Sequence, residues 1–108
     1  AAETRDYFRY EVRQALSEEK DALEKALRIA YDLQRKYGRA MVSCAGELAA
    51  VEEQLDAYQL HSAEFAAITA RMPGLRGKAE SSERFYRLTG DIIENWKRQL
   101  YDVERAAE

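Results

Sequence analysis

The sequence predicts an all-α fold, either an elongated three-helix bundle or a helical hairpin, with coiled-coil-like packing. The composition favours long helices, because 34% of the residues are charged and the chain has only five Gly and one Pro. Seven Tyr, three Phe and one Trp are too many aromatic residues for a disordered chain. A column of apolar residues at seven-residue spacing indicates a coiled-coil seam. With 108 residues, we expect one helical domain spanning 1–108.

The seam is the set of residues found by counting along the chain in steps of seven. Such residues lie on the same side of a helix, so the seam turns one face towards a partner helix. We therefore expect this face to be buried. Its members are Leu16, Leu23, Ala30, Tyr37, Cys44, Val51, Tyr58, Phe65 and Met72.

The first predicted helix covers residues 5–37 and ends at Gly38. Glycine commonly follows the last residue of a helix, and Arg35 and Lys36 supply the positive charge that suits the last turn. The seam nevertheless continues in phase through Gly38, and this agreement favours one helix over residues 5–72. Two alternatives remain, a bundle that turns at Gly38 and a long helix with a shorter returning helix.

The second predicted helix covers residues 39–72. Pro73, Gly74 and Gly77 come directly after it, and this combination predicts that the helix stops and the chain turns. Gly46 lies inside the helix among small Ala residues, which predicts a place where two helices approach closely.

The third predicted helix covers residues 82–106. Ser81 or Ser82 can cap its N-terminus, where the charge of Glu83 interacts favourably with the helix dipole. Its apolar residues follow helical spacing, so we expect one buried face. Trp96 lies on that face and is expected to hold this helix against the others.

Charge and hydropathy make some classes of partner less favourable than others. The formal net charge of −3 gives no general attraction to nucleic acid or to anionic lipid. No apolar run approaches the roughly 18 residues that a membrane span requires, so no membrane partner is predicted. The single cysteine, Cys44, cannot form an internal disulfide, which favours a reducing, cytoplasmic location.

The sequence contains no recognisable catalytic or metal-binding pattern. Cys44 and His61 are separated by nearly five helical turns, about 25 Å on one helix, which is too far for a nucleophile and its base. His61 is the only histidine, and it precedes Glu64 in the reverse of the order that di-iron bundles use. We predict no enzyme activity, no cofactor and no metal.

One candidate surface combines aromatic residues near the N-terminus with the seam. Tyr7, Phe8 and Tyr10 alternate with arginines, which is the composition of a protein-interface hot spot. Seam residues add a long face for a second helix. The predicted partner-binding residues are Tyr7, Phe8, Tyr10, Leu23, Tyr37, Val51, Tyr58 and Phe65.

A second candidate surface is the basic segment 71–87. In a three-helix bundle this segment lies at the same end as the N-terminus, where further arginines add positive charge. The predicted anion-binding residues are Arg71, Arg76, Lys78, Arg84 and Arg87.

These features predict a non-enzymatic helical protein–protein interaction module, such as an adaptor, an assembly subunit or a chaperone-like protein. We expect its partner to be another protein or a second copy of the chain, with self-association through the seam into a homo-oligomer. The alternative is a helical protein that binds nucleic acid or another anion through the basic loop 71–87.

Overall fold

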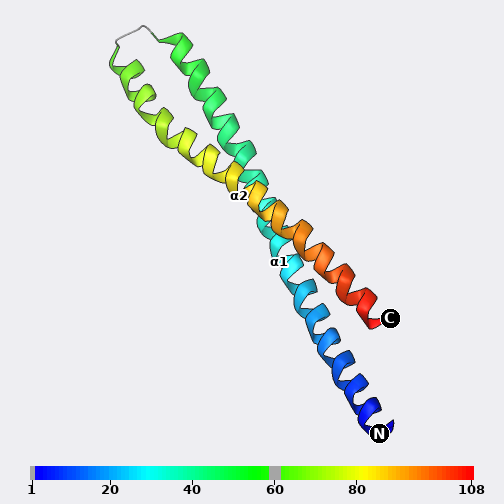
Figure 1. Ribbon diagram of the computed structural model, residues 1–108. Helices are drawn as coiled ribbons and strands as arrows, with labels where there is room; N and C mark the ends of the chain where they lie inside the picture. Colours follow the sequence, from blue (N-terminus) through cyan, green and yellow to red (C-terminus); the bar gives the residue numbers. More distant parts are fainter. Residues whose placement is uncertain (1, 59–61) are drawn as a thin grey trace. The chain divides into compact units, whose positions relative to one another are not determined.

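A computed structural model describes residues 2–58 and 62–108. Over these residues the chain forms two α-helices and no strand: α1 spans Ala2–Ala57 and α2 spans Ala63–Ala107 (Figure 1). The all-α fold and its helical-hairpin form are confirmed. The three-helix alternative is wrong, because neither predicted break at Gly38 or at Pro73–Gly77 interrupts a helix.

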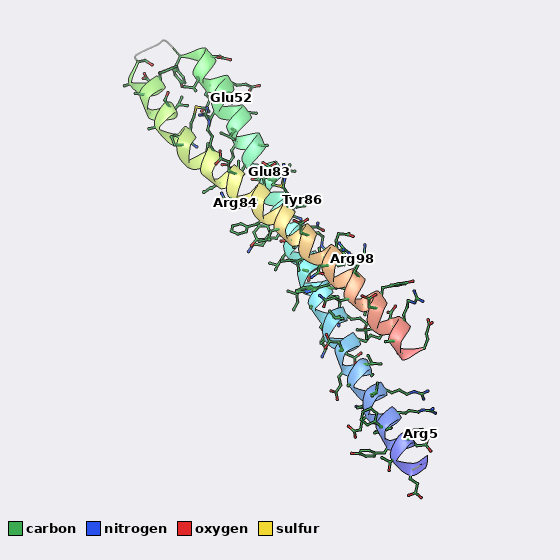
Figure 2. All side chains as sticks on the ribbon, in the orientation of Figure 1. Arg5, Glu52, Glu83, Arg84, Tyr86 and Arg98 are labelled. Atoms are coloured by element: carbon green, nitrogen blue, oxygen red, sulfur yellow. The ribbon has the colours of Figure 1, made fainter. Side chains whose placement is uncertain are left out.

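Gly38 lies within α1, in contact with α2, and does not end the helix. A Cβ atom at this position would lie 3.3 Å from Cε2 of Tyr86, which projects from α2 (Figure 2). Glycine thus lets the Tyr86 ring approach the backbone of α1 closely. The alternative of one helix that continues through Gly38 is confirmed, although α1 ends at Ala57 and does not reach residue 72.

Pro73 lies within α2, and the predicted stop at residues 72–77 is also wrong. Proline in a helix interior costs about 3 kcal/mol, because it has no N–H to donate and its ring crowds the preceding turn. Met72 and Leu75, on either side of it, are buried against Val51. Burial of two such side chains contributes about 1.5–3 kcal/mol each, enough to offset the proline.

The chain turns between Ala57 and Ala63, a position that the sequence reasoning missed. Ser62 caps α2: its Oγ accepts a hydrogen bond from the Phe65 N–H at 3.1 Å, and its carbonyl accepts one from the Ala66 N–H at 3.1 Å. Serine is among the preferred N-cap residues, and the acidic Glu64 in the first turn suits the positive end of the helix dipole. The predicted caps, Ser81 and Ser82, lie inside α2 instead.

Two compact units make up the chain, and each pairs a stretch of α1 with a stretch of α2. Unit 1 combines α1 up to Asp32 with residues Thr89–Glu108. Its core is a cluster of Leu27, Ala30 and Ile93, against which Trp96 and Leu100 pack. Trp96 therefore lies on the inner face of α2, as predicted, and its role in holding this helix stays a prediction.

Unit 2 comprises residues Leu33–Leu88 and contains the turn. In it, Tyr37 of α1 stacks on Phe85 of α2, with ring centroids 5.3 Å apart. Cys44 is buried and unpaired. The apolar cluster of unit 2 consists of Val51, Met72 and Leu75, with Leu48, Leu55 and Ile68 packed against it.

Gly46 does not mark a close approach of two helices. A Cβ atom there would have no other atom within 4 Å, so this part of α1 is open. The small residues that predicted close packing belong to an outer face of α1, since Ala45, Ala49 and Ala50 are exposed.

Candidate protein-interaction surface

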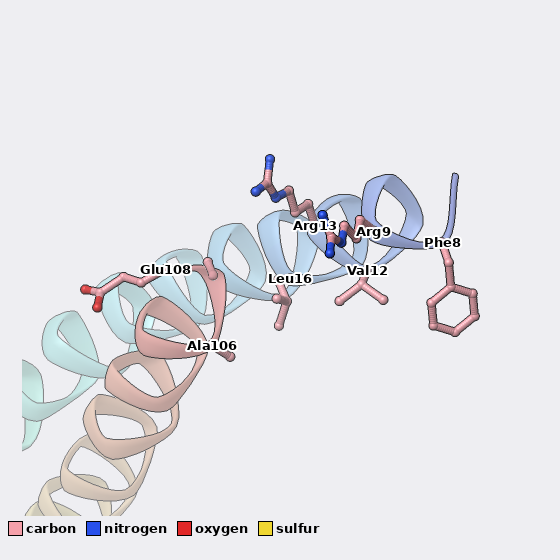
Figure 3. A pocket seen from close by; sticks show the side chains of 8 residues that line it. Phe8, Arg9, Val12, Arg13, Leu16, Ala106 and Glu108 are labelled. Atoms are coloured by element: carbon pink, nitrogen blue, oxygen red, sulfur yellow. The ribbon is translucent and has the colours of Figure 1, made fainter. Parts of the chain in front are cut away.

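In unit 1, the start of α1 has no covering from α2. Every side chain from Glu3 to Ala15 is exposed, Leu16 is half-buried and Leu23 is buried. The last residues of α2 reach only the level of Leu16, beside which they form the wall of a pocket (Figure 3). We call residues 3–15 the N-terminal extension.

The apolar face of α1 that α2 covers continues onto the N-terminal extension. Phe8, Val12 and Leu16 are spaced by four residues, so they follow one another along the helix surface. Figure 3 shows their side chains projecting to the same side of α1. Phe8 is 69% exposed and Val12 is 45% exposed. We call Phe8 and Val12 the uncovered face.

A pocket of about 310 Å³ lies where α2 ends against α1. Apolar side chains of α1 form part of its lining, and arginines of α1 and the carboxylate of Glu108 add charges of both signs. It is lined by Phe8, Arg9, Val12, Arg13, Leu16, Ala106, Ala107 and Glu108 (Figure 3).

A row of arginines borders the uncovered face on one side. Arg5, Arg9 and Arg13 are also spaced by four residues, and Arg5 lies near the start of α1 (Figure 2). Asp6 and Tyr10 share a pocket with Arg9 and Arg13, so Asp6 reduces the positive charge of this edge without cancelling it. Within residues 3–58 and 62–108, none of these three arginines forms an ion pair.

The aromatic cluster predicted near the N-terminus is divided between faces. Tyr7 is 66% exposed and Tyr10 is 64% exposed. Residues one or two positions apart on a helix do not share a face, so neither tyrosine extends the uncovered face that begins at Phe8. The candidate site residues predicted from the sequence do not include Val12, although its spacing of four residues from Phe8 and from Leu16 can be recognised in the sequence.

The predicted partner-binding residues of the seam lie mostly inside the hairpin. Leu23 and Val51 are buried, and Tyr37 is half-buried in its stack with Phe85. Phe65 is half-buried in the first turn of α2 and Tyr58 is 44% exposed just after α1. Leu23 and Val51 are therefore not available to a partner while α1 and α2 are paired.

The predicted anion-binding residues belong to helix α2 and not to a loop. Arg71, Arg76, Lys78 and Arg84 are exposed. Arg87 forms an ion pair with Glu83, one turn earlier on the same helix. The three-helix arrangement that would bring this segment beside the N-terminus does not exist.

The structure also bears on metal and membrane binding. No group of three His, Cys, Asp or Glu residues comes together within the part of the chain that is described, and His61 lies outside that part. None of the described helices is both long and apolar enough to cross a membrane. Comparisons of the chain with protein families, curated proteins and solved structures find no match. Residue chemistry and geometry alone must therefore indicate the function.

Proposed function

We propose that this chain is a non-enzymatic helical protein–protein interaction module whose contact surface is the N-terminal extension. The observation that carries this proposal is the uncovered face, where Phe8 and Val12 continue a buried helix interface into solvent. Large apolar side chains in line with a buried face are typical of docking surfaces. An adaptor, an assembly subunit or a chaperone-like protein would use such a surface.

The limited core of the hairpin supports this role. Among the described residues, no side chain is less than 2% exposed. Two helices alone bury little apolar surface, so a further helix would add stabilisation at the exposed positions. Cys44, a buried free thiol, suits a reducing cytoplasmic setting.

Self-association through the seam would require a larger rearrangement of the chain than binding through the N-terminal extension. Leu23 and Val51 are already buried within the hairpin. A second copy could reach them only if α2 first separated from α1. The exposed residues of the N-terminal extension require no such rearrangement.

Site-specific photocrosslinking tests the proposal. We would introduce benzoylphenylalanine at Phe8 and, as a matched control, at the exposed Arg28 of the same helix, in cells that produce this protein. We expect a discrete crosslinked product from position 8 and none from position 28. The proposal fails if both positions give the same pattern or if neither gives a product.

A further inference from the structure

We infer that the N-terminal extension binds an amphipathic helix of another protein, which packs along the uncovered face and has acidic side chains bordering its own apolar face. This inference rests on the proposed function and adds the chemistry of the partner. Two observations carry it: the uncovered face continues an existing helix–helix interface, and a row of arginines borders that face.

The continuity of the interface defines the shape of the partner. In unit 1, Leu23 and Leu27 are buried, and the core cluster formed by Leu27 and Ala30 includes Ile93 of α2. At Leu16 the covering ends with Ala106 and Ala107, and Phe8 and Val12 follow without cover. A row of apolar residues along one side of a helix is a surface on which another helix packs. The partner helix would present apolar residues at positions i, i+3, i+4 and i+7.

The arginine row defines the charge of the partner. Arg5, Arg9 and Arg13 follow one edge of the uncovered face for two helical turns. They outnumber the two acidic residues that share pockets with Arg9 and Arg13, which are Asp6 and Glu108. Side chains at the edges of a helix pair decide which partner is accepted and in which orientation. Glutamate or aspartate on the facing edge of the partner would pair with these arginines.

A second copy of this chain fits the same surface poorly. In an antiparallel pair of identical helices each edge meets its own counterpart, so the Arg9 and Arg13 edge would face the same edge of the other copy. In a parallel pair, the partner helix would have to continue past Leu16 into the place that α2 already occupies.

The probe is a synthetic helical peptide of about 20 residues with a leucine stripe, long enough to be helical in an alanine-rich background. One version carries Glu on both sides of the stripe, and a matched version carries Lys at the same positions. Both are labelled with a fluorophore and titrated with the full chain, and binding is followed by fluorescence anisotropy at low and moderate salt. We expect the acidic peptide to bind about tenfold or more tightly than the basic peptide, with a preference that declines as salt rises.

Three variants connect that binding to the structure. Phe8→Ala should weaken binding of the acidic peptide about tenfold, as expected for an aromatic anchor. Tyr7→Ala is the matched control, because Tyr7 is similarly exposed but lies on another face, and it should bind as the parent chain does. Arg9→Glu combined with Arg13→Glu should reverse the preference in favour of the basic peptide, a result that damage to folding would not produce.

The outcomes separate this inference from the proposed function. Equal binding of the two peptides, or no loss on Phe8→Ala, overturns the acidic helix as the partner. If neither peptide binds and light scattering shows a dimer that Phe8→Ala abolishes, the occupant is a second copy and this inference is wrong, while the interaction module stands. If neither peptide binds and position 8 also gives no crosslinked product, both proposals fail.

Discussion

Two glycines of α1 have opposite surroundings, although both lie inside the same helix. At Gly38 a Cβ atom would meet the Tyr86 ring at 3.3 Å, whereas at Gly46 it would meet nothing within 4 Å. The first glycine permits a close contact between α1 and α2, and the second is only a weak helix former in an open position. Both residues are glycine, and the presence or absence of a neighbouring side chain from α2 decides the role of each.

The two glycines should therefore respond differently to replacement by alanine. We expect Gly46→Ala to raise the free energy of unfolding by up to about 1 kcal/mol, because alanine is the better helix former and has room there. Gly38→Ala should raise the free energy of unfolding by less than Gly46→Ala does, or should lower it, because the Tyr86 ring must shift. Urea unfolding followed by circular dichroism measures both, and equal gains in the two variants would contradict the close contact.

Ser62 illustrates how a single side chain defines the start of a helix. Its Oγ accepts a hydrogen bond from the Phe65 N–H, one of the donors that have no partner within the helix. We expect Ser62→Ala to lower the free energy of unfolding by about 1 kcal/mol. Ser43→Ala is the matched control, since Ser43 lies exposed inside α1, and it should change stability little. Similar thermal shifts in both variants would show that Ser62 is not the cap.

At the scale of the element, α2 is a helix that contains a strong helix breaker. Pro73 and Gly74 are exposed, whereas Met72 and Leu75 are buried against Val51 of α1. Local preference favours a turn here, but a turn would remove Met72 and Leu75 from that cluster. Tertiary packing thus outweighs local preference in α2.

Replacement of Pro73 tests this balance directly. We expect Pro73→Ala to raise the free energy of unfolding by about 1–3 kcal/mol and to preserve the helical content, because it restores a backbone donor and removes crowding in the preceding turn. Arg71→Ala, at an exposed position nearby, should have little effect. A loss of helical circular dichroism in Pro73→Ala would mean that the chain needs a break at this proline.

At the scale of the whole molecule, each of the two units depends on its own small cluster. Trp96 packs against the cluster of unit 1 and Leu55 against that of unit 2. We expect Trp96→Ala and Leu55→Ala each to lower the free energy of unfolding by about 2–5 kcal/mol, nearer the lower value because both side chains are half-buried. Leu88→Ala is the control, since Leu88 is 52% exposed. Unchanged melting temperatures in both core variants would refute these buried faces.

The sequence by itself determined the helical class, the part of the seam from Leu16 to Val51 and the exposed aromatic residues near the N-terminus, because heptad spacing and composition act locally and can be read without knowledge of neighbours. It did not determine where the chain turns. Gly38 and Pro73 both favour a break locally, and only the packing of Tyr86 on Gly38 and of Met72 and Leu75 on Val51 makes helix more stable at both places. The pairing of α1 with α2 decides that Leu23 lies buried, whereas Phe8 and Val12 lie exposed. The candidate surface is therefore a property of the tertiary structure, since burial depends on which residues of the two helices face each other.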